Sequence, residues 1–242
     1  MDFINACREL NIELSAVQLK QFEEYYRLLI EWNERMNLTA ITEREEVYLK
    51  HFLDSLSFVR AFDDPSLLIQ KDFSLIDIGT GAGFPGVPIK ILCPGSHVVL
   101  MDSLNKRLSF LDEVIEKLNL NETGSVKTVH ARAEDLAKDP AYREQFDYVT
   151  SRAVANLSTL SEYCLPFSKV GGSFISFKAE KAAEELTAAK NALFLLGGAF
   201  SKEVSFVLPG SDLGRTLIVI SKKQNTSKKY PRKAGLPSKS PL

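Results

Sequence analysis

A short apolar segment followed by a glycine-rich turn constrains the fold of this chain more than any other feature. Residues 75–86 read LIDIGTGAGFPG. The apolar run predicts a buried strand, and Gly79, Gly81 and Gly83 predict a sharp turn that opens a helix. Glycine lets the backbone approach a ligand closely where a Cβ atom would collide with it. The segment therefore predicts the first strand of an α/β fold, with a ligand at its end.

The spacing of these glycines favours a nucleoside that presents no phosphate. Dinucleotide sites use G-x-G-x-x-G, whereas Phe84 stands at the sixth position here. S-adenosylmethionine enzymes use the form D-x-G-x-G-x-G, in which Asp77 is the acid and Gly79 and Gly81 are the first two glycines. Asp77 stands near a strand end, where it would meet the ligand, so we expect Asp77, Gly79 and Gly81 to bind the cofactor. A second apolar run, residues 97–102, ends in Asp102, where an acid can bind ribose hydroxyls. The glycines alone fit any tight turn, but together with Asp102 they predict a nucleoside site.

Composition points to an ordinary globular protein. The chain has 242 residues, of which 45% are hydrophobic and 25% charged. No apolar run approaches the roughly 20 residues of a membrane span, and the first ten residues lack the apolar core of a signal peptide. The cysteines are scattered and form no CxxC pair, which predicts buried thiols in a reducing compartment. We therefore expect a cytoplasmic protein, with neither membrane nor metal partner.

The charges are distributed unevenly along the chain. Residues 221–242 carry seven lysines and arginines and no acid, so the remaining residues carry −8, since the total is −1. A basic tail on an acidic body is typical of an arm that binds nucleic acid. Pro231, Pro237 and Pro241 favour disorder in the free protein. The alternative is a solvated terminus with no partner.

Hydrophobic periodicity divides the chain into three parts. Apolar residues at helical spacing predict a helix over residues 12–37, with Ser15 and Gln18 as a capping box, and a second helix over 43–62. We assign residues 1–62 to a helical cap, 63–221 to a catalytic domain, and 222–242 to the basic tail.

Within the central part, strands and helices alternate, which predicts a parallel sheet covered on both faces. The expected strands are 74–78, 97–101, 125–130, 146–151 and 173–178, and the expected helices are 84–93, 104–119, 134–138, 155–168 and 179–197. Two later runs, 204–208 and 215–220, flank a turn-rich connector and predict an antiparallel hairpin at the edge. This is the layout of the class I methyltransferase fold, a Rossmann-like mixed seven-stranded α/β sheet.

Several longer motifs resemble one family. The stretches are HFLDSL at 51–56, IDIGTGAGFPGVPIKI at 76–91, LMDSLNKRLSFL at 100–111, HARAEDL at 130–136 and VTSRAVANL at 149–157. In this order they resemble the bacterial 16S ribosomal RNA guanine-N7 methyltransferases, also called the glucose-inhibited division protein B family. The resemblance implies S-adenosylmethionine as cofactor and 16S ribosomal RNA within the small ribosomal subunit as partner. We expect a monomer.

The resemblance also implies a set of cofactor-binding residues: Gly79 and Phe84 beside the cofactor, Asp102 on the ribose, Ala133 and Glu134 on the adenine, and Arg152 after the fourth strand. Glu134 also fits a second role, that of a first-turn acid stabilised by its helix dipole. For Arg152, the methionine carboxylate of the cofactor and a phosphate of the RNA are both plausible partners, because arginine favours such forks.

The chemistry expected of this site needs no general base. Guanine N7 carries an exposed lone pair and no proton, so positioning and exclusion of water would suffice. The amine-methylating motif Asn/Asp-Pro-Pro-aromatic is absent after the fourth strand, where Thr150-Ser151-Arg152-Ala153 stands instead. The candidates for positioning the target are Phe84, Arg152 and Lys178.

Three nearby features remain open. Lys178 either contacts the target nucleotide or is a solvated lysine at a strand end. His51 and Asp54, three residues apart on one helix face, either close the cofactor pocket or hydrogen-bond each other. Lys106 and Arg107 either contact RNA or coat a helix.

Two rival functions stand beside the main prediction. One is a methyltransferase of the same fold that acts on a small molecule or a protein. The other is a ribosome-binding protein without catalytic activity, which would fail to bind the cofactor. An NAD enzyme is disfavoured by Phe84.

Overall fold

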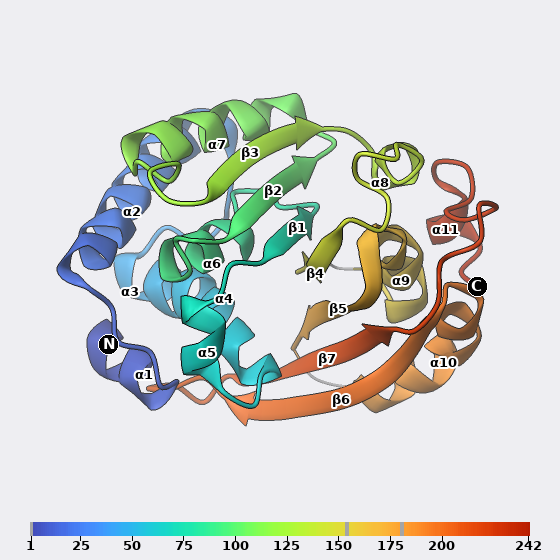
Figure 1. The fold of residues 1–242 in the computed structure, drawn as a ribbon. Helices are drawn as coiled ribbons and strands as arrows, with labels where there is room; N and C mark the ends of the chain where they lie inside the picture. The colour runs from blue at the N-terminus through green and yellow to red at the C-terminus, as the bar shows by residue number, and fades with distance from the viewer. Residues whose placement is uncertain (1, 153–154, 180–181) are drawn as a thin grey trace.

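The computed structural model describes residues 2–152, 155–179 and 182–242, and in these residues a single mixed sheet organises the fold (Figure 1). It has seven strands in the order β3-β2-β1-β4-β5-β7-β6. The strands are β1 (Ser74–Ile78), β2 (His97–Asp102), β3 (Ser125–His130), β4 (Phe146–Ser151), β5 (Ser168–Lys178), β6 (Gly198–Val207) and β7 (Gly214–Lys222). The expected fold class is confirmed.

The first five strands are parallel, and the last two form the expected hairpin. β5 and β6 begin earlier than expected, at Ser168 and Gly198 instead of 173 and 204, because their first residues pair in the sheet but are mostly too exposed to form an apolar run. β7 runs antiparallel to both β5 and β6. The chain moves outward from β1 to β2 and β3, then returns to place β4 on the other side of β1. This reversal makes the carboxyl end of β1 a topological switch point, where open α/β sheets bind their ligands. The glycine-rich turn follows β1 directly.

Apolar side chains alternate between the two faces of the sheet, so two cores form. In β1, Leu75 belongs to one core and Ile76 to the other. One core contains residues of α2 (Ala16–Met36), α6 (Gly86–Leu92) and α7 (Asn105–Lys117); the other contains residues of α8 (Ala133–Leu136), α9 (Leu157–Cys164) and α10 (Ala182–Leu195). Burial on both faces is what a parallel sheet requires. The helix expected over 179–197 begins later, and residues 180–181 lie outside the described part.

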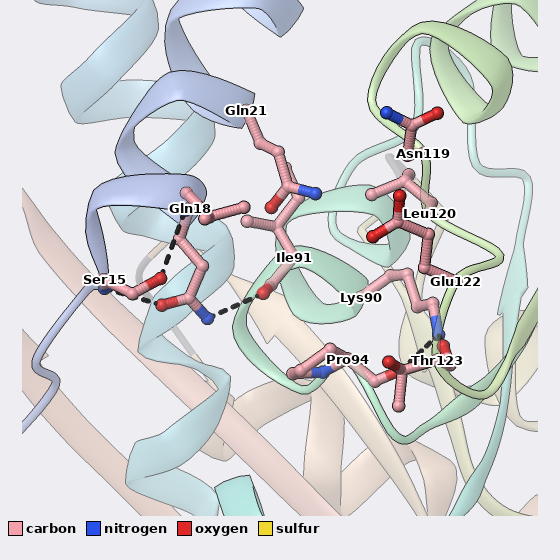
Figure 2. Close-up of a pocket in the computed structure, with 11 residues that line it drawn as sticks. Ser15, Gln18, Gln21, Lys90, Ile91, Pro94, Asn119, Leu120, Glu122 and Thr123 are labelled. Carbon is pink, nitrogen blue, oxygen red and sulfur yellow. Dashed lines mark hydrogen bonds between the residues drawn. The ribbon is translucent and has the colours of Figure 1, made fainter.

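The N-terminal cap packs on the α6–α7 side of the sheet. The capping box of Ser15 and Gln18 is present, and the Gln18 amide also donates to the Ile91 carbonyl at 2.8 Å, which docks α2 on α6 (Figure 2). The helix expected over 43–62 is a helical segment with an irregular centre. Its parts are α3 (Arg44–Val47), a π-helical turn Tyr48–Leu53, α4 (Asp54–Leu56) and a 3₁₀ turn Ser57–Ala61. Two short helices, α1 (Phe3–Glu9) and α5 (Pro65–Gln70), were not expected.

The expectation of a disordered tail is wrong. Residues after β7 fold back on the body, and α11 (Leu236–Lys239) packs against α9 (Figure 1). Lys222 belongs to β7, where its buried ammonium donates to the Leu165 carbonyl at 2.6 Å. The Arg232 guanidinium pairs with the buried carboxylate of Glu162 at 2.6 Å. Two of the seven cations that predicted a free basic arm, Lys222 and Arg232, are therefore bound by buried acceptors in the rest of the protein.

Candidate active site at the carboxyl edge of the sheet

The glycine-rich loop is fixed to the end of β2 and faces open space. The Gly79 and Thr80 amides donate to the Met101 carbonyl at 2.9 and 3.0 Å. Gly79 and Gly81 have φ angles of +71° and +62°, which other residues adopt only under strain. A Cβ atom built on either glycine would meet no atom within 4 Å. The loop therefore leaves room on this side for a ligand that a larger side chain would obstruct.

The third glycine serves packing rather than ligand access. A Cβ atom on Gly83 would lie 2.7 Å from Val87 and 2.8 Å from Leu111. Beside it, the fully buried Tyr25 of α2 donates its hydroxyl hydrogen to the Ala82 carbonyl. The cap thereby holds the loop in place. The helical periodicity over residues 12–37 counts Tyr25 as an apolar core residue. Its hydroxyl gives no signal in a pattern of apolar spacing.

Asp77, which we expected to bind the cofactor, is fully buried and bonds the loop itself. Its fully buried carboxylate accepts hydrogen bonds from the Thr80 hydroxyl at 2.7 Å, the Gly86 amide at 2.9 Å and the Thr150 hydroxyl at 3.3 Å. These donors link the loop, the start of α6 and β4 through one side chain. Burial raises the pKa of Asp77 to about 6, although the hydrogen bonds oppose this shift.

The raised pKa of Asp77 predicts a pH-dependent difference between the wild type and Asp77→Asn. From about pH 4 to about pH 6 the folded state holds a proton on Asp77 that the unfolded chain has released, so stability falls as pH rises. The asparagine variant lacks this proton. Chemical denaturation should show the wild-type free energy of unfolding, minus that of the variant, falling by about 2 kcal/mol between pH 4 and pH 7. A difference that does not change with pH would contradict this assignment.

Asp102, the residue expected to bind the ribose, lies beside the loop at the end of β2. Its nearly buried carboxylate accepts from the Gly81 amide at 3.0 Å and the Leu104 amide at 2.9 Å. Arg107 pairs with the same carboxylate at 3.2 Å, and its side chain is 39% exposed. Arg107 is therefore a local partner of Asp102 and not merely part of a helix surface.

Ala133 and Glu134 open α8, directly after β3, and both are buried. The Glu134 carboxylate accepts a hydrogen bond from the Gly235 amide of the tail at 2.9 Å. The position expected at the adenine thus also contacts the C-terminal segment, which the sequence did not indicate.

A buried carboxylate joins two arginines on the other side of the loop. Asp54, on the cap, accepts from Arg152 and from Arg215, each at 2.7 Å. Arg152 follows β4 and also lies 5.2 Å from the centre of the Phe84 ring. Arg215 lies in β7 and was not singled out from the sequence, since a single arginine after a turn carries no pattern. Ala153, the neighbour of Arg152, lies outside the described residues.

His51 packs flat on Phe84. Their ring centres are 4.6 Å apart with an angle of 19° between the planes. His51 Nε2 hydrogen-bonds the Thr39 hydroxyl at 2.9 Å, whereas Asp54 bonds the two arginines, so the expected alternative of a His51–Asp54 bond is wrong. Burial and then the Arg152 cation lower the pKa of His51 to about 4. His51 is therefore neutral at pH 7.

Lys178 is held inward rather than solvated. Its side chain is 8% exposed, and its ammonium donates to Glu185 at 2.7 Å and to the Ala155 carbonyl at 3.0 Å. The alternative of a solvated lysine is therefore wrong. Lys178 lines a cavity of about 360 Å³ between the cap and the ends of β4, β5 and β7. Its cationic lining residues are Lys50, Arg152, Lys178 and Arg215.

A second cavity, of about 250 Å³, lies at the opposite edge of the sheet, where α2 begins and α6 ends (Figure 2). The Lys90 ammonium there donates to the carbonyls of Pro94, Ser96 and Thr123 at 2.5, 2.8 and 2.7 Å. These three bonds use all the donors of the ammonium group. We assign this cluster to structure, since ligands of open α/β sheets bind at the other edge.

Neither a metal-ligand cluster nor a membrane-spanning helix occurs in the described part of the chain. No group of three or more histidine, cysteine, aspartate or glutamate side chains is arranged to hold a metal ion there. None of the described helices combines the length and apolar character needed to cross a membrane.

The loop and its surroundings fit S-adenosylmethionine. Gly79 and Gly81 leave the open side that a bound ligand needs, and Asp102 offers carboxylate oxygens beside it. Solved structures with this fold include M. jannaschii TYW2 in complex with AdoMet. It aligns with a TM-score of 0.50 and 15% identity, over 63% of this chain and 70% of that one. P. horikoshii TYW2 in complex with MeSAdo has the same score and identity over 62% and 57%. These likenesses establish the class I methyltransferase fold.

Sequence comparisons identify the family. The family model described as rRNA small subunit methyltransferase G matches residues 18–211. The protein named ribosomal RNA small subunit methyltransferase G from Exiguobacterium sp. is 52% identical over 99% of this chain and 98% of its own length. The protein of that name from Limosilactobacillus reuteri is 53% identical over the same shares. The chain therefore belongs to the rRNA small subunit methyltransferase G family of S-adenosylmethionine-dependent enzymes.

Proposed function

We propose that this protein transfers a methyl group from S-adenosylmethionine to N7 of one guanine in the small-subunit ribosomal RNA. The observation that carries the proposal is the cation-lined cavity beside the glycine-rich loop. Its charged lining residues are four cations and the carboxylate of Asp54, which leaves a positive excess suited to a polyanionic substrate. The names of the relatives support ribosomal RNA as that substrate.

We assign the cofactor to the glycine-rich loop. Gly79 and Gly81 would lie against it, Asp102 would accept the ribose hydroxyls, and Ala133 with Glu134 would border the adenine. The cofactor supplies an electrophilic methyl group. Asp77 and Tyr25 keep the loop in shape, so the fully buried Asp77 would serve the cofactor through the loop.

The residues around the cavity suit a nucleophile that carries no proton. Guanine N7 has a free lone pair, and beside it O6 accepts hydrogen bonds. Because N7 has no proton to lose, no general base is needed, and the neutral His51 can stay bonded to Thr39. Phe84, packed between His51 of the cap and Arg152, would help to exclude water from the reacting centre. Lys178 and Arg152 would hold O6 or the adjoining phosphate, which orients N7 towards the methyl group.

The function is tested by methyl incorporation. Purified protein and labelled S-adenosylmethionine are incubated with small ribosomal subunits from cells that lack this protein, with large subunits as the control. Label should enter the RNA of the small subunit alone. Absence of label despite measured cofactor binding would favour a different substrate, and absence of binding would favour the non-enzymatic alternative.

Lys178→Met is expected to lower kcat/KM for small subunits by at least about tenfold, because the cavity loses a cation that orients the target. The dissociation constant for S-adenosylmethionine should stay unchanged, because Lys178 lies on the substrate side. Lys190→Met, on the exposed surface of α10, serves as the charge-matched control. Equal kinetics for the two variants would remove Lys178 from the substrate site.

A further inference from the structure

We propose that residues 226–242, here called the C-terminal strap, position α8 and thereby set the affinity for S-adenosylmethionine. The inference rests on the proposed function, because it takes Ala133 and Glu134 as the border of the adenine site. The strap bonds the start of α8 directly, through Glu134, and reaches its C-cap residue, Ala137, through Arg143. Figure 1 shows the C-terminal segment running past α8 and α9. Arg232, through its pair with Glu162, is the positioning residue that anchors it.

The first contact is at the start of α8. The Gly235 amide donates to Glu134 at 2.9 Å, and the Glu134 side chain is buried. Gly235 has a φ of +80°, which a glycine adopts without strain. The strap thereby fixes the side chain of Glu134, which is next to Ala133 at the expected border of the adenine site.

The second contact is at the end of α8. One nitrogen of the Arg143 guanidinium donates to the carbonyl of Ala137, the C-cap residue, at 2.9 Å, and to the Tyr230 carbonyl at 3.0 Å. The other donates to the Thr226 carbonyl at 2.6 Å. Arg143 therefore joins the end of α8 to the strap, whose Tyr230 ring is buried.

The strap is anchored by a buried ion pair. Glu162 of α9 has a side-chain exposure of 1% and accepts from the Arg232 amide at 2.7 Å and from its guanidinium at 2.6 and 2.9 Å. The Thr159 hydroxyl adds a bond to the Pro237 carbonyl at 3.1 Å. Loss of Arg232 would leave the buried Glu162 carboxylate without its cationic partner, which strongly disfavours the docked state.

The coupling to the cofactor follows from the length of α8. A four-residue helix is far too short to be stable by itself, so its neighbours determine its conformation. If the strap holds α8 in the shape that binds adenine, strap release weakens cofactor binding. Because such coupling is reciprocal, bound cofactor must also stabilise the docked strap by the same factor.

The test compares Arg232→Ala with Lys233→Ala in the full-length protein. Both substitutions remove one positive charge from adjacent positions, but Lys233 is exposed. Isothermal titration with S-adenosylmethionine should give a dissociation constant about tenfold higher for Arg232→Ala and an unchanged one for Lys233→Ala. Arg232→Lys, which keeps the charge and loses the fork, should fall between Arg232→Ala and wild type.

A lower melting temperature of Arg232→Ala with an unchanged dissociation constant would make the strap purely structural and overturn the proposal. Failure of the wild type to bind S-adenosylmethionine would overturn the proposed function as well, so the two failures are distinguishable.

A second measurement needs no variant. Saturating S-adenosylmethionine should slow tryptic cleavage of the wild-type strap after Lys233 by about tenfold, because the cofactor favours the docked state. Cleavage at the same rate with and without cofactor would exclude the coupling.

Discussion

Replacing Asp54 with alanine is expected to lower the free energy of unfolding by about 3–5 kcal/mol and to abolish methyl transfer. Asp54 is the shared partner of Arg152 and Arg215, each at 2.7 Å, and its side chain is 5% exposed. Alanine would leave both guanidinium groups in a partly buried site without their carboxylate. In a chain of this size, such a loss corresponds to a fall of roughly 6–20 °C in the melting temperature.

Asp63→Ala is the matched control for this prediction. Asp63 also pairs with a cation, Lys202, but its side chain is 99% exposed. Exposed ion pairs contribute little because water already solvates their charges. Thermal unfolding should therefore separate the two aspartates clearly. Similar melting temperatures for both variants would show that the ion pairs of Asp54 with Arg152 and Arg215 do not stabilise the fold.

Gly79→Ala is expected to weaken S-adenosylmethionine binding by about tenfold to a hundredfold. The added methyl group points into the open side of the loop, where the cofactor would lie, and overpacking of this kind typically costs about 1–3 kcal/mol. The variant also carries the backbone strain of a left-handed alanine, since φ is +71°.

Strain and obstruction can be separated with Gly171→Ala. Gly171, in β5, has a φ of +89° and open space around its Cβ position, but it does not belong to the glycine-rich loop. Both alanine variants should lose similar stability in chemical denaturation. Only Gly79→Ala should lose affinity in calorimetric titration. Equal affinity in the two variants would place the cofactor elsewhere.

The sheet could be predicted from the sequence because its strands are short apolar runs separated by clear turns. The third and fourth strands, 125–130 and 146–151, have the expected bounds. The glycine-rich loop was also predictable, since the φ angles at Gly79 and Gly81 require that residue type. These features depend on local sequence alone.

Features that depend on long-range pairing could not be predicted in the same way. Arg215 is 161 residues from Asp54, and nothing near either residue indicates that they pair. The π-helical turn at Tyr48–Leu53 interrupts an otherwise regular periodicity. The roles of Tyr25 and Arg215 emerged only when the fold brought their polar atoms to the loop and to Asp54.

The tail shows how composition can mislead. Its lysines, arginines and prolines predict disorder when they are counted without their partners. In the fold, Glu162 and Glu144 lie where Arg232 and Lys222 meet them. Other lysines of the tail, such as Lys233, are exposed, so the expected contact of the tail with nucleic acid stays a prediction.

The central claim is that the methyl group goes to N7 of a guanine, and locating the modified base tests this most directly. Small-subunit RNA methylated by this protein would be cleaved by chemistry specific for N7-methylguanine and read by primer extension. The account predicts one strong new stop, at a guanine, that is absent without S-adenosylmethionine. Label in the RNA without such a stop would contradict the claim, because the methyl group would then lie on another atom.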